Sequence, residues 1–279
     1  MGEIGRVVND DLIRNGVQTT LIDFPQNVLR DEAGYRRELT KAIIDHGPGI
    51  VVPIGNPRAM ARFRDELTSR FPGLRVCVED YDKVSLLDSK VESYRLAETL
   101  GIPVPPLFLD PGDVDEGTMV IFKRDVSYGG HGVHVPRTRK ALRHLIEHQS
   151  PGEPYLIEKF IEGMEFSLDV LRSDKGSESS VYHCRRSGGN GPAQERVHVG
   201  REECFQGIPC ECFDAMVSCS VKMLDALNYV GICGFDFIVE SRSGVPYLLE
   251  CNPRFTGGIA VQISSGFDIP MKLIEMQES

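Results

Sequence analysis

The 279-residue sequence predicts an α/β segment followed by two α+β lobes. Three observations lead there: apolar runs that alternate with helical stretches near the start, a glycine-rich loop between two β-prone segments, and a late pair of alternating segments typical of an antiparallel hairpin. We therefore expect a parallel α/β lobe at 1–84, a connecting helix and strand at 85–115, a small lobe at 116–162 and an antiparallel-sheet lobe at 163–279.

The first lobe is predicted from two short apolar runs, at 18–23 and 49–54, each followed by a helical stretch, near 33–46 and 56–70. This alternation is typical of parallel β–α units. No glycine-rich turn follows the first run, so the lobe is expected to be abbreviated. The absence of a G-x-G-x-x-G motif argues against a dinucleotide site.

Composition excludes several classes of function. The formal net charge of −10 disfavours nonspecific binding to nucleic acid or to an anionic membrane surface. No apolar run reaches the roughly 18 residues that a membrane span needs. The first six residues lack the basic-then-apolar pattern of a secretory signal, so a cytoplasmic location is expected.

The eight cysteines form no C-x-x-C pair, which disfavours a structural zinc site. The cluster from Cys204 to Cys219 leaves two interpretations. Reduced, mostly buried thiols are favoured, and the alternative is a zinc-binding protein organised by this cluster.

A helix is predicted to begin after Ser89, because Ser89 and Glu92 have the spacing of a capping box. Gly101 and Pro103 are expected to end it. Lys90 then lies in the first helical turn, close to where an anion would dock. The alternative is a solvated lysine.

The glycine-rich loop is predicted to be the tip of a hairpin between strands at 119–124 and 132–135, followed by a helix near 139–149 and a strand at 154–159. Glycines let backbone N–H groups approach phosphate oxygens closely, although any hairpin tip can be glycine-rich. The loop residues predicted to bind phosphate are Ser127, Gly129, Gly130 and Gly132, with Lys123 on the strand that leads into them, whereas His131 is expected to face solvent.

The segment Glu158–Lys159–Phe160–Ile161 ends the last strand of this lobe. Glu158 is a candidate acceptor for an adenine amino group, and the backbone near Ile161 for the ring. Glu165 is a candidate for ribose hydroxyls. The alternative for either glutamate is a surface charge.

The last lobe is expected to contain a strand at 165–171, a long loop at 185–203, a helix with an apolar stripe from Phe213 to Leu227, and a hairpin at 230–252. Arg185 and Arg186, at the start of the loop, are candidates to clamp a substrate carboxylate. Solvent-facing arginines are the alternative.

The hairpin yields the strongest local argument. If 241–245 forms its loop, Asp236 lies directly opposite Glu250, and Asn252 shares the face of Glu250. Like charges in this position destabilise a sheet unless a cation lies between them, and the oxygen ligands suit Mg²⁺ or Mn²⁺. A solvent-exposed acidic face is the alternative. Arg254 projects the same way and is a candidate to neutralise a transferring phosphoryl group, or else one half of an ion pair.

Taken in order, these residues resemble the ATP-grasp superfamily, in particular its carbamoyl-phosphate-synthetase-like and amino-acid-ligase branch. The resemblance covers most of 85–260. The matching stretches are 89–90 with Leu100–Pro105, Val120–Lys123 with Gly129–Gly132, Glu158–Val170, and Gly234–Asp236 with Glu250–Gly258.

The resemblance implies an ATP-grasp fold with a small lid lobe and ATP bound between two antiparallel sheets. By family analogy Lys90 and Lys123 contact phosphates, and Glu158, with the Ile161 backbone, contacts adenine. The analogy also implies that Glu165 binds the ribose and that Arg254 contacts phosphate and the reaction intermediate. It implies that two Mg²⁺ ions are bound by Asp236, Glu250 and Asn252. Thr256, Gly257 and Gly258 lie where ligases of this branch contact substrate.

The resemblance further implies a ligase that activates a carboxylate as an acylphosphate and joins it to an amine. The expected partners are small, amino-acid-like molecules, and a homodimer is left open. The sequence holds one such unit, so carbamoyl phosphate synthesis by this chain alone is not expected. The alternative function is a non-catalytic ATP-binding module, or one component of a larger carbamoyl-phosphate-synthetase-like assembly.

Overall fold

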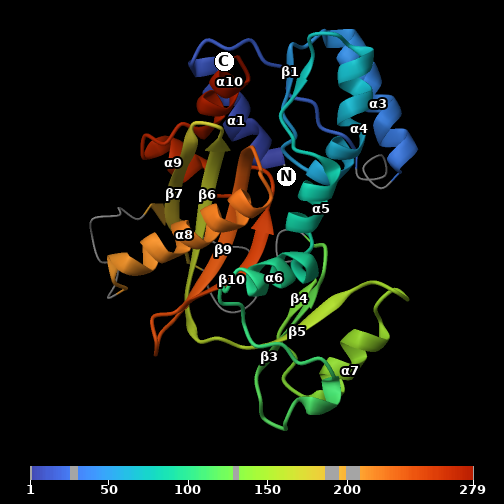
Figure 1. Ribbon diagram of the computed structural model, residues 1–279. Helices are drawn as coiled ribbons and strands as arrows, with labels where there is room; N and C mark the ends of the chain where they lie inside the picture. Colours follow the sequence, from blue (N-terminus) through green and yellow to red (C-terminus); the bar gives the residue numbers. More distant parts are fainter. Residues whose placement is uncertain (1, 26–30, 128–131, 186–194, 199–207, 279) are drawn as a thin grey trace.

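The computed structural model describes residues 2–25, 31–127, 132–185, 195–198 and 208–278. Figure 1 shows three regions: an N-terminal group of helices beside a small sheet, a central sheet, and a small lobe built around β3, β4 and β5. The described helices are α1 (Gly2–Arg14), α3 (Glu32–His46), α4 (Pro57–Arg70), α5 (Tyr81–Asp88), α6 (Lys90–Thr99), α7 (Arg139–Glu147), α8 (Cys210–Ala226), α9 (Ile259–Ser264) and α10 (Ile269–Glu278), with a 3-10 turn at Pro111–Asp113.

The N-terminal region contains a two-stranded parallel sheet, β1 (Ile50–Val51) and β2 (Arg75–Val76), joined by α4. The predicted parallel unit is therefore present, although β1 is shorter than the expected run at 49–54. The predicted strand at 18–23 is wrong. This stretch forms no strand, and Leu21 and Ile22 remain 43% and 40% exposed. An apolar run becomes a strand only where a partner strand can pair with it.

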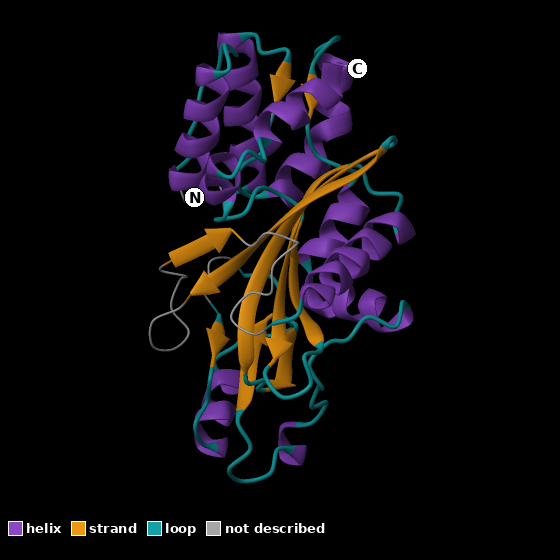
Figure 2. Ribbon diagram, turned by 90° about the vertical axis from the view of Figure 1, so that its left-hand side faces the viewer, coloured by secondary structure: helices purple, strands orange, loops and turns teal. Residues whose placement is uncertain are grey.

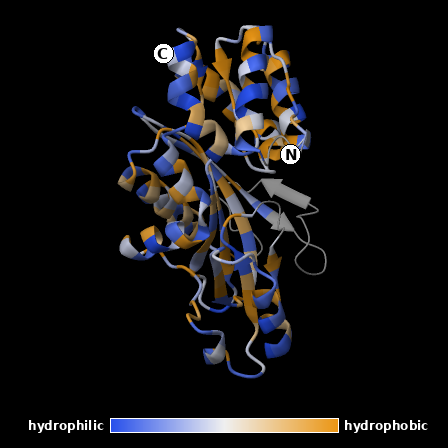
Figure 3. Ribbon diagram, turned by 90° about the vertical axis from the view of Figure 1, so that its right-hand side faces the viewer, coloured by the Kyte–Doolittle hydropathy of each residue, from blue (hydrophilic) through white to orange (hydrophobic). Residues whose placement is uncertain are grey.

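The α1 helix was not anticipated. It packs against α9 and α10, and its Val8 and Leu12 join Phe255, Ile259 and Leu273 in one buried cluster. The first and last helices of the described chain therefore lie side by side (Figure 1). In Figure 3 apolar and polar segments alternate along the N-terminal helices, as expected where one face of each helix is buried.

The small lobe holds an antiparallel sheet in the order β4-β3-β5. Its strands are β3 (Val120–Arg124), β4 (Val133–His134) and β5 (Tyr155–Lys159). Phe122 is fully buried and stacks on Tyr155, with ring centroids 5.3 Å apart. The predicted hairpin, the helix α7 and the following strand are confirmed.

The central sheet has the order β10-β9-β6-β7-β8 and is antiparallel throughout. Its strands are β6 (Gly163–Ser173), β7 (Gly176–Arg185), β8 (Glu195–His198), β9 (Gly231–Glu240) and β10 (Pro246–Asn252). The predicted loop at 185–203 is wrong at β8, which pairs with β7. Because β7 and β8 are polar, their strand character comes from backbone pairing rather than from an apolar pattern.

One face of this sheet is apolar and covered by helices (Figure 2). Phe166, Phe235 and Phe237 project from it and pack against Phe213 and Met216 of α8, which confirms the predicted apolar stripe. The opposite face carries polar residues at alternate positions, because successive side chains of a strand point to opposite sides. Among the described residues, no helix is long and apolar enough to span a bilayer.

Candidate nucleotide and metal site

A cleft of about 270 Å³ opens between the small lobe and the polar face of the central sheet. Nine residues predicted from the sequence line it: Lys123, Ser127, Glu158, Lys159, Phe160, Ile161, Glu165, Asp236 and Glu250. Pro105, Ile121, Ile238 and Leu249 add apolar walls that sequence reasoning did not assign. The fold thus brings together residues that lie more than 100 positions apart. A cleft that combines apolar walls with charged groups suits a nucleotide.

At the small-lobe side of the cleft, Lys123 and Glu158 form a buried ion pair with an N–O distance of 2.6 Å. The two side chains are adjacent because β3 and β5 pair there, with Ile121 opposite Glu158 and Lys123 opposite Leu156. The hydroxyl of Tyr94, on α6, donates to Glu158 Oε2 (2.9 Å) and also lies 3.0 Å from the carbonyl oxygen of Leu249.

Tyr94 thus ties α6 to both sheets of the cleft, a role that sequence analysis did not find, because its helical spacing indicated only a core residue. Burial raises its pKa well above the usual value, and the Glu158 carboxylate adds to this effect, so Tyr94 stays a hydrogen-bond donor. A carboxylate has about four acceptor positions, so Glu158 keeps acceptor capacity toward the cleft after these two contacts.

On the sheet side of the cleft, Asp236 lies directly opposite Glu250, as predicted. The pairing reaches this register through a β-bulge. Near the turn, Pro246 pairs with Val239, and an irregularity between Leu248 and Glu250 moves the register by one residue. The bulge therefore brings the two carboxylates across from each other.

The electrostatics of this pair are asymmetric. Burial, followed by the charge of Glu250, raises the pKa of Asp236 to about 8. Burial, the largest single influence, would also raise the pKa of Glu250, but the Lys90 ammonium 3.1 Å away, the hydrogen bond with Asp236 and the charge of Lys123 together outweigh it and lower that pKa to about 2. Ser167 donates to Asp236 Oδ1 from the neighbouring strand. Two carboxylates that cannot both ionise cheaply are the arrangement that a divalent cation stabilises.

The donor set fits Mg²⁺. The two carboxylates supply hard oxygen ligands, whereas the Asn252 amide would have to turn to add a third, because its Nδ2 lies 3.4 Å from Glu250 Oε1 and its Oδ1 accepts from Arg254. The described residues hold no group of three or more His, Cys, Asp or Glu side chains placed to bind a metal. Mg²⁺ usually takes one or two carboxylates together with water and substrate phosphates, so the protein need not supply more.

Lys90 lies behind Glu250 rather than in solvent. It is 4% exposed, and its Nζ contacts the carbonyl oxygens of Asp125 and Ser127 at 3.3 Å as well as Glu250. The N-terminus of α6 is occupied by the protein itself. The Asp125 carboxylate accepts from the Val91 N–H (2.9 Å) and from the Ser89 hydroxyl (2.8 Å). The helix cap is confirmed, because Ser89 Oγ accepts from the Glu92 N–H.

The remaining loop predictions are only partly within the described chain. Gly129, Gly130 and His131 lie outside the described residues. Gly132 has φ +85°, a conformation that favours glycine, and its carbonyl accepts from the Arg124 N–H at 2.9 Å. Phosphate binding by this loop stays a prediction.

Beyond the end of β10, Arg254 donates to Asn252 Oδ1 (3.2 Å) and to the Phe255 carbonyl (2.9 Å). Thr256 and Gly258 are buried, while Gly257 is partly exposed. Arg185 ends β7, and Arg186 lies outside the described residues. Roles for these residues in substrate binding stay predictions.

Six cysteines are free thiols: Cys77, Cys210, Cys212, Cys219, Cys233 and Cys251. Burial raises the pKa of both Cys212 and Cys219. Cys204, the first member of the proposed zinc cluster, lies outside the described residues. The two interpretations of this cluster, buried thiols or a zinc site, both stay predictions.

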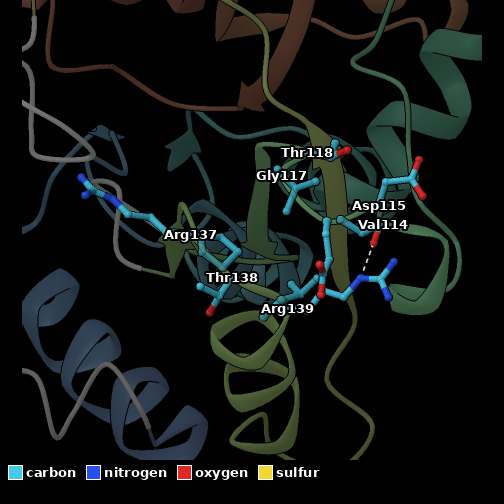
Figure 4. Close-up of a pocket in the computed structure, with 11 residues that line it drawn as sticks. Val114, Asp115, Gly117, Thr118, Arg137, Thr138 and Arg139 are labelled. Carbon is cyan, nitrogen blue, oxygen red and sulfur yellow. Dashed lines mark hydrogen bonds between the residues drawn. The ribbon is translucent and has the colours of Figure 1, made fainter.

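A second cavity, of about 250 Å³, lies in the small lobe between the segment Val114–Thr118 and the start of α7 (Figure 4). Arg139 crosses it and donates to the Val114 carbonyl at 2.6 Å. None of the residues predicted for the site lines this cavity.

Comparison with known proteins agrees with this geometry. The family model described as "ATP-grasp domain" matches residues 87–258, so the chain belongs to the ATP-grasp family. The resemblance seen in the sequence is thereby confirmed.

Among individual relatives, the carbamoyl phosphate synthase large chain, C-terminal section, of Methanopyrus kandleri is 26% identical over 219 residues, which cover 72% of this chain and 39% of that protein. The chain thus spans well under half the length of this curated relative.

Solved structures confirm the fold. The biotin carboxylase domain of 2-oxoglutarate carboxylase from Hydrogenobacter thermophilus, solved as a dimer with MgADP, ADP and bicarbonate, has a TM-score of 0.76 at 17% identity and covers 99% of this chain and 68% of its own. An L-amino acid ligase from Bacillus licheniformis has a TM-score of 0.71 at 17% identity, with coverage of 98% and 70%.

Proposed function

We propose that this chain is an ATP- and Mg²⁺-dependent ligase that activates a carboxylate as an acylphosphate and joins it to an amine, with amino-acid-like substrates. The observation that carries the proposal is the pair Asp236 and Glu250, opposite each other on the central sheet, in a cleft that also contains the buried Lys123–Glu158 pair. Family membership supports the same activity.

The position of each predicted site residue supports a specific role in this reaction. Glu158 and the backbone of Phe160 and Ile161 would receive adenine in the apolar part of the cleft, and Glu165 the ribose. Lys123 would turn toward the phosphates. Arg254, beyond Asn252, would balance charge on the transferring phosphoryl group. The work of the protein is mainly positioning and charge neutralisation, as is general for phosphoryl transfer.

The charge of the cleft supports a requirement for divalent cations. Its lining carries five carboxylates and two lysines, and Lys90 is the nearest additional cation behind Glu250. A triphosphate tail would therefore enter a negatively charged site. Asp236, Glu250 and Asn252 would hold Mg²⁺, which would supply the missing positive charge beside the phosphates. We propose two ions, for which Mn²⁺ can substitute.

In the reaction, a substrate carboxylate attacks the γ-phosphorus, which gives the acylphosphate and ADP, and the amine then displaces phosphate. Water must be kept away from the acylphosphate. The small lobe lies over the cleft and is the part of the fold placed to exclude water.

The test is a panel of amino acids and small carboxylates, with and without amines, assayed for phosphate and ADP release with ATP and Mg²⁺. We expect one pair to stimulate release and Glu250→Gln to abolish it. Glu240→Gln, near the outer end of β9, is the matched control and should retain activity. AMP as the nucleotide product contradicts the mechanism.

The alternative function is an ATP-binding module or one component of a larger carbamoyl-phosphate-synthetase-like assembly. The greater length of the curated relatives favours keeping it. Tight MgATP binding without turnover across the whole panel supports this alternative. We include a homodimer in the proposal, because one structural neighbour was solved as a dimer, and light scattering on the purified chain tests it.

A further inference from the structure

A buried carboxylate outside the cleft lining, Asp169 on β6, has no role in the proposed reaction so far. It is fully buried, and in the sheet it lies opposite Ser180 of β7 and Gly234 of β9. The neighbouring row of the same face holds Ser167 and Asp236. Asp169 therefore lies on the polar face of the sheet, buried two residues along β6 from the row that holds Ser167 and Asp236.

The hydrogen bonds of Asp169 go to the segment that follows β10. Its Oδ2 accepts from the Thr256 hydroxyl at 2.8 Å and from the Gln262 amide at 2.5 Å. A threonine hydroxyl has one proton, so the Thr256 oxygen must accept from Tyr182, whose hydroxyl lies 2.5 Å away. The resulting chain runs in one direction, from Tyr182 through Thr256 to Asp169.

An acidic side chain at this buried position is unfavourable for the free energy of folding. Among the described residues, Asp169 forms no ion pair within 4 Å, and burial raises its pKa to about 6, although the hydrogen bonds from Thr256 and Gln262 and the charge of Arg254 oppose that shift. A buried carboxylate without a partner charge destabilises a fold. The hydrogen bonds from Thr256 and Gln262 offset part of this cost and tie the carboxylate to the segment after β10.

Close packing allows the segment 254–258 only one position against the sheet. A Cβ atom on Gly234 would lie 2.1 Å from Thr256 Cγ2, and one on Gly258 would lie 2.1 Å from the Tyr182 ring. Real Cβ atoms do not come so close, so both glycines are required by their neighbours. The Thr256 side chain faces the interior and is fully used. Besides the Arg254 guanidinium, any substrate contact from this segment therefore falls to the backbone around Gly257.

We propose that Asp169 is a positioning residue that fixes the segment 254–258, and with it the guanidinium of Arg254, relative to the carboxylates of Asp236 and Glu250. Arg254 is held on one side by Asn252 at the end of β10 and on the other by the backbone that leads to Thr256. The anchored hydroxyl of Thr256 is the second fixed point. The catalytic part of this inference rests on the proposed function of Arg254.

The experiment compares Asp169→Asn, Thr256→Val and Thr256→Ser with the control Asp174→Asn, which lies exposed at the turn between β6 and β7. Hydrogen–deuterium exchange of the peptide 252–263 measures the positioning directly. We expect Asp169→Asn and Thr256→Val to speed exchange in 254–258 at least tenfold, with β9 unchanged. Thr256→Ser keeps the hydroxyl and should stay within threefold of wild type, as should Asp174→Asn.

Turnover and nucleotide binding are measured in parallel. We expect the Asn and Val variants to lower kcat at least tenfold, with KM for ATP and the affinity for a non-hydrolysable ATP analogue within threefold of wild type. Unchanged exchange in Asp169→Asn, or a Thr256→Ser variant as mobile as Thr256→Val, overturns the inference. Wild-type protein that shows no carboxylate-dependent release refutes the proposed function instead, and the exchange data still decide the role of Asp169.

Discussion

The two ion pairs Lys123–Glu158 and Arg95–Glu92 have the same N–O distance, 2.6 Å, and lie in adjoining parts of the molecule. They differ in burial. The side chains of the first pair are 8% and 2% exposed, and those of the second are 68% and 49% exposed. A double-mutant cycle on each pair therefore isolates the effect of burial at a fixed distance.

The expected magnitudes follow from what each substitution leaves behind. Lys123→Met leaves the Glu158 charge buried with the Tyr94 hydroxyl as its one side-chain donor among the described residues, and we expect a loss of about 3–5 kcal/mol in the free energy of unfolding. Glu158→Gln leaves the Lys123 ammonium near Tyr94 OH (3.4 Å) and the Leu249 carbonyl (3.5 Å), contacts at the limit of hydrogen bonding. This variant should lose about 2–3 kcal/mol.

The double variant removes both charges, so its loss should fall short of the sum of the single losses by at least about 2 kcal/mol. For the exposed pair, Arg95→Met and Glu92→Gln should couple by only about 0.2–0.5 kcal/mol, because water screens the charges and ordering two long side chains opposes the pairing.

The assay is urea unfolding at pH 7.5 without nucleotide or metal, followed by far-UV circular dichroism and by tyrosine fluorescence, since the chain has no tryptophan. Coincident transitions by both probes justify the two-state free energies. A coupling energy for Lys123 and Glu158 below about 0.5 kcal/mol, equal to that of the exposed pair, would refute the claim that this pair is a buried element of the cleft.

Three further predictions concern other parts of the chain. Burial, with a contribution from Asp268, raises the pKa of Asp11 from 3.8 to about 6, so the native state binds this proton more tightly and loses stability as pH rises from about 4 to above 6. Asp11→Asn should therefore raise the thermal midpoint by about 3–6 °C at pH 8 and little at pH 4.5. An equal gain at both pH values contradicts the assignment. Gly234→Ala should destabilise the fold by about 3 kcal/mol through its clash with Thr256 Cγ2, and adding Thr256→Ser should restore part of this loss in urea unfolding, whereas no recovery argues against the clash. Removal of Mg²⁺ by EDTA should weaken ADP binding at least tenfold in wild type and much less in Glu250→Gln, as measured by calorimetry, and an equal Mg²⁺ dependence in both proteins argues against the metal site.

The register of the last hairpin shows what sequence can predict and why. The opposition of Asp236 and Glu250 was expected from a uniform ladder with a loop at 241–245. The structure reaches the same opposition by another route, with a one-residue offset at Pro246 and a bulge at Leu249 that cancels it. The alternating pattern identifies which residues share the cleft face, but a bulge is decided by local backbone pairing that the pattern does not encode.

The errors have a common physical origin. The run at 18–23 is more apolar than β7, yet β7 is the strand, because β6 offers a long edge to pair with and the first run finds no partner. Tyr94, Asp125 and Asp169 were missed for a related reason. Their side chains meet residues more than 30 positions away, so their partners follow from tertiary packing rather than from spacing in the sequence.

The same packing changes how nucleotide binding must proceed. A sequence presents Lys90 and Lys123 as two free cations ready for phosphate, but in the structure both are already paired, with Glu250 and Glu158. Phosphate binding by either lysine therefore requires an exchange of partners. A divalent cation on Glu250 would release Lys90, and an adenine amino group on Glu158 would weaken its hold on Lys123. Metal, base and phosphate should consequently bind with positive coupling, because each compensates a charge that another one uncovers.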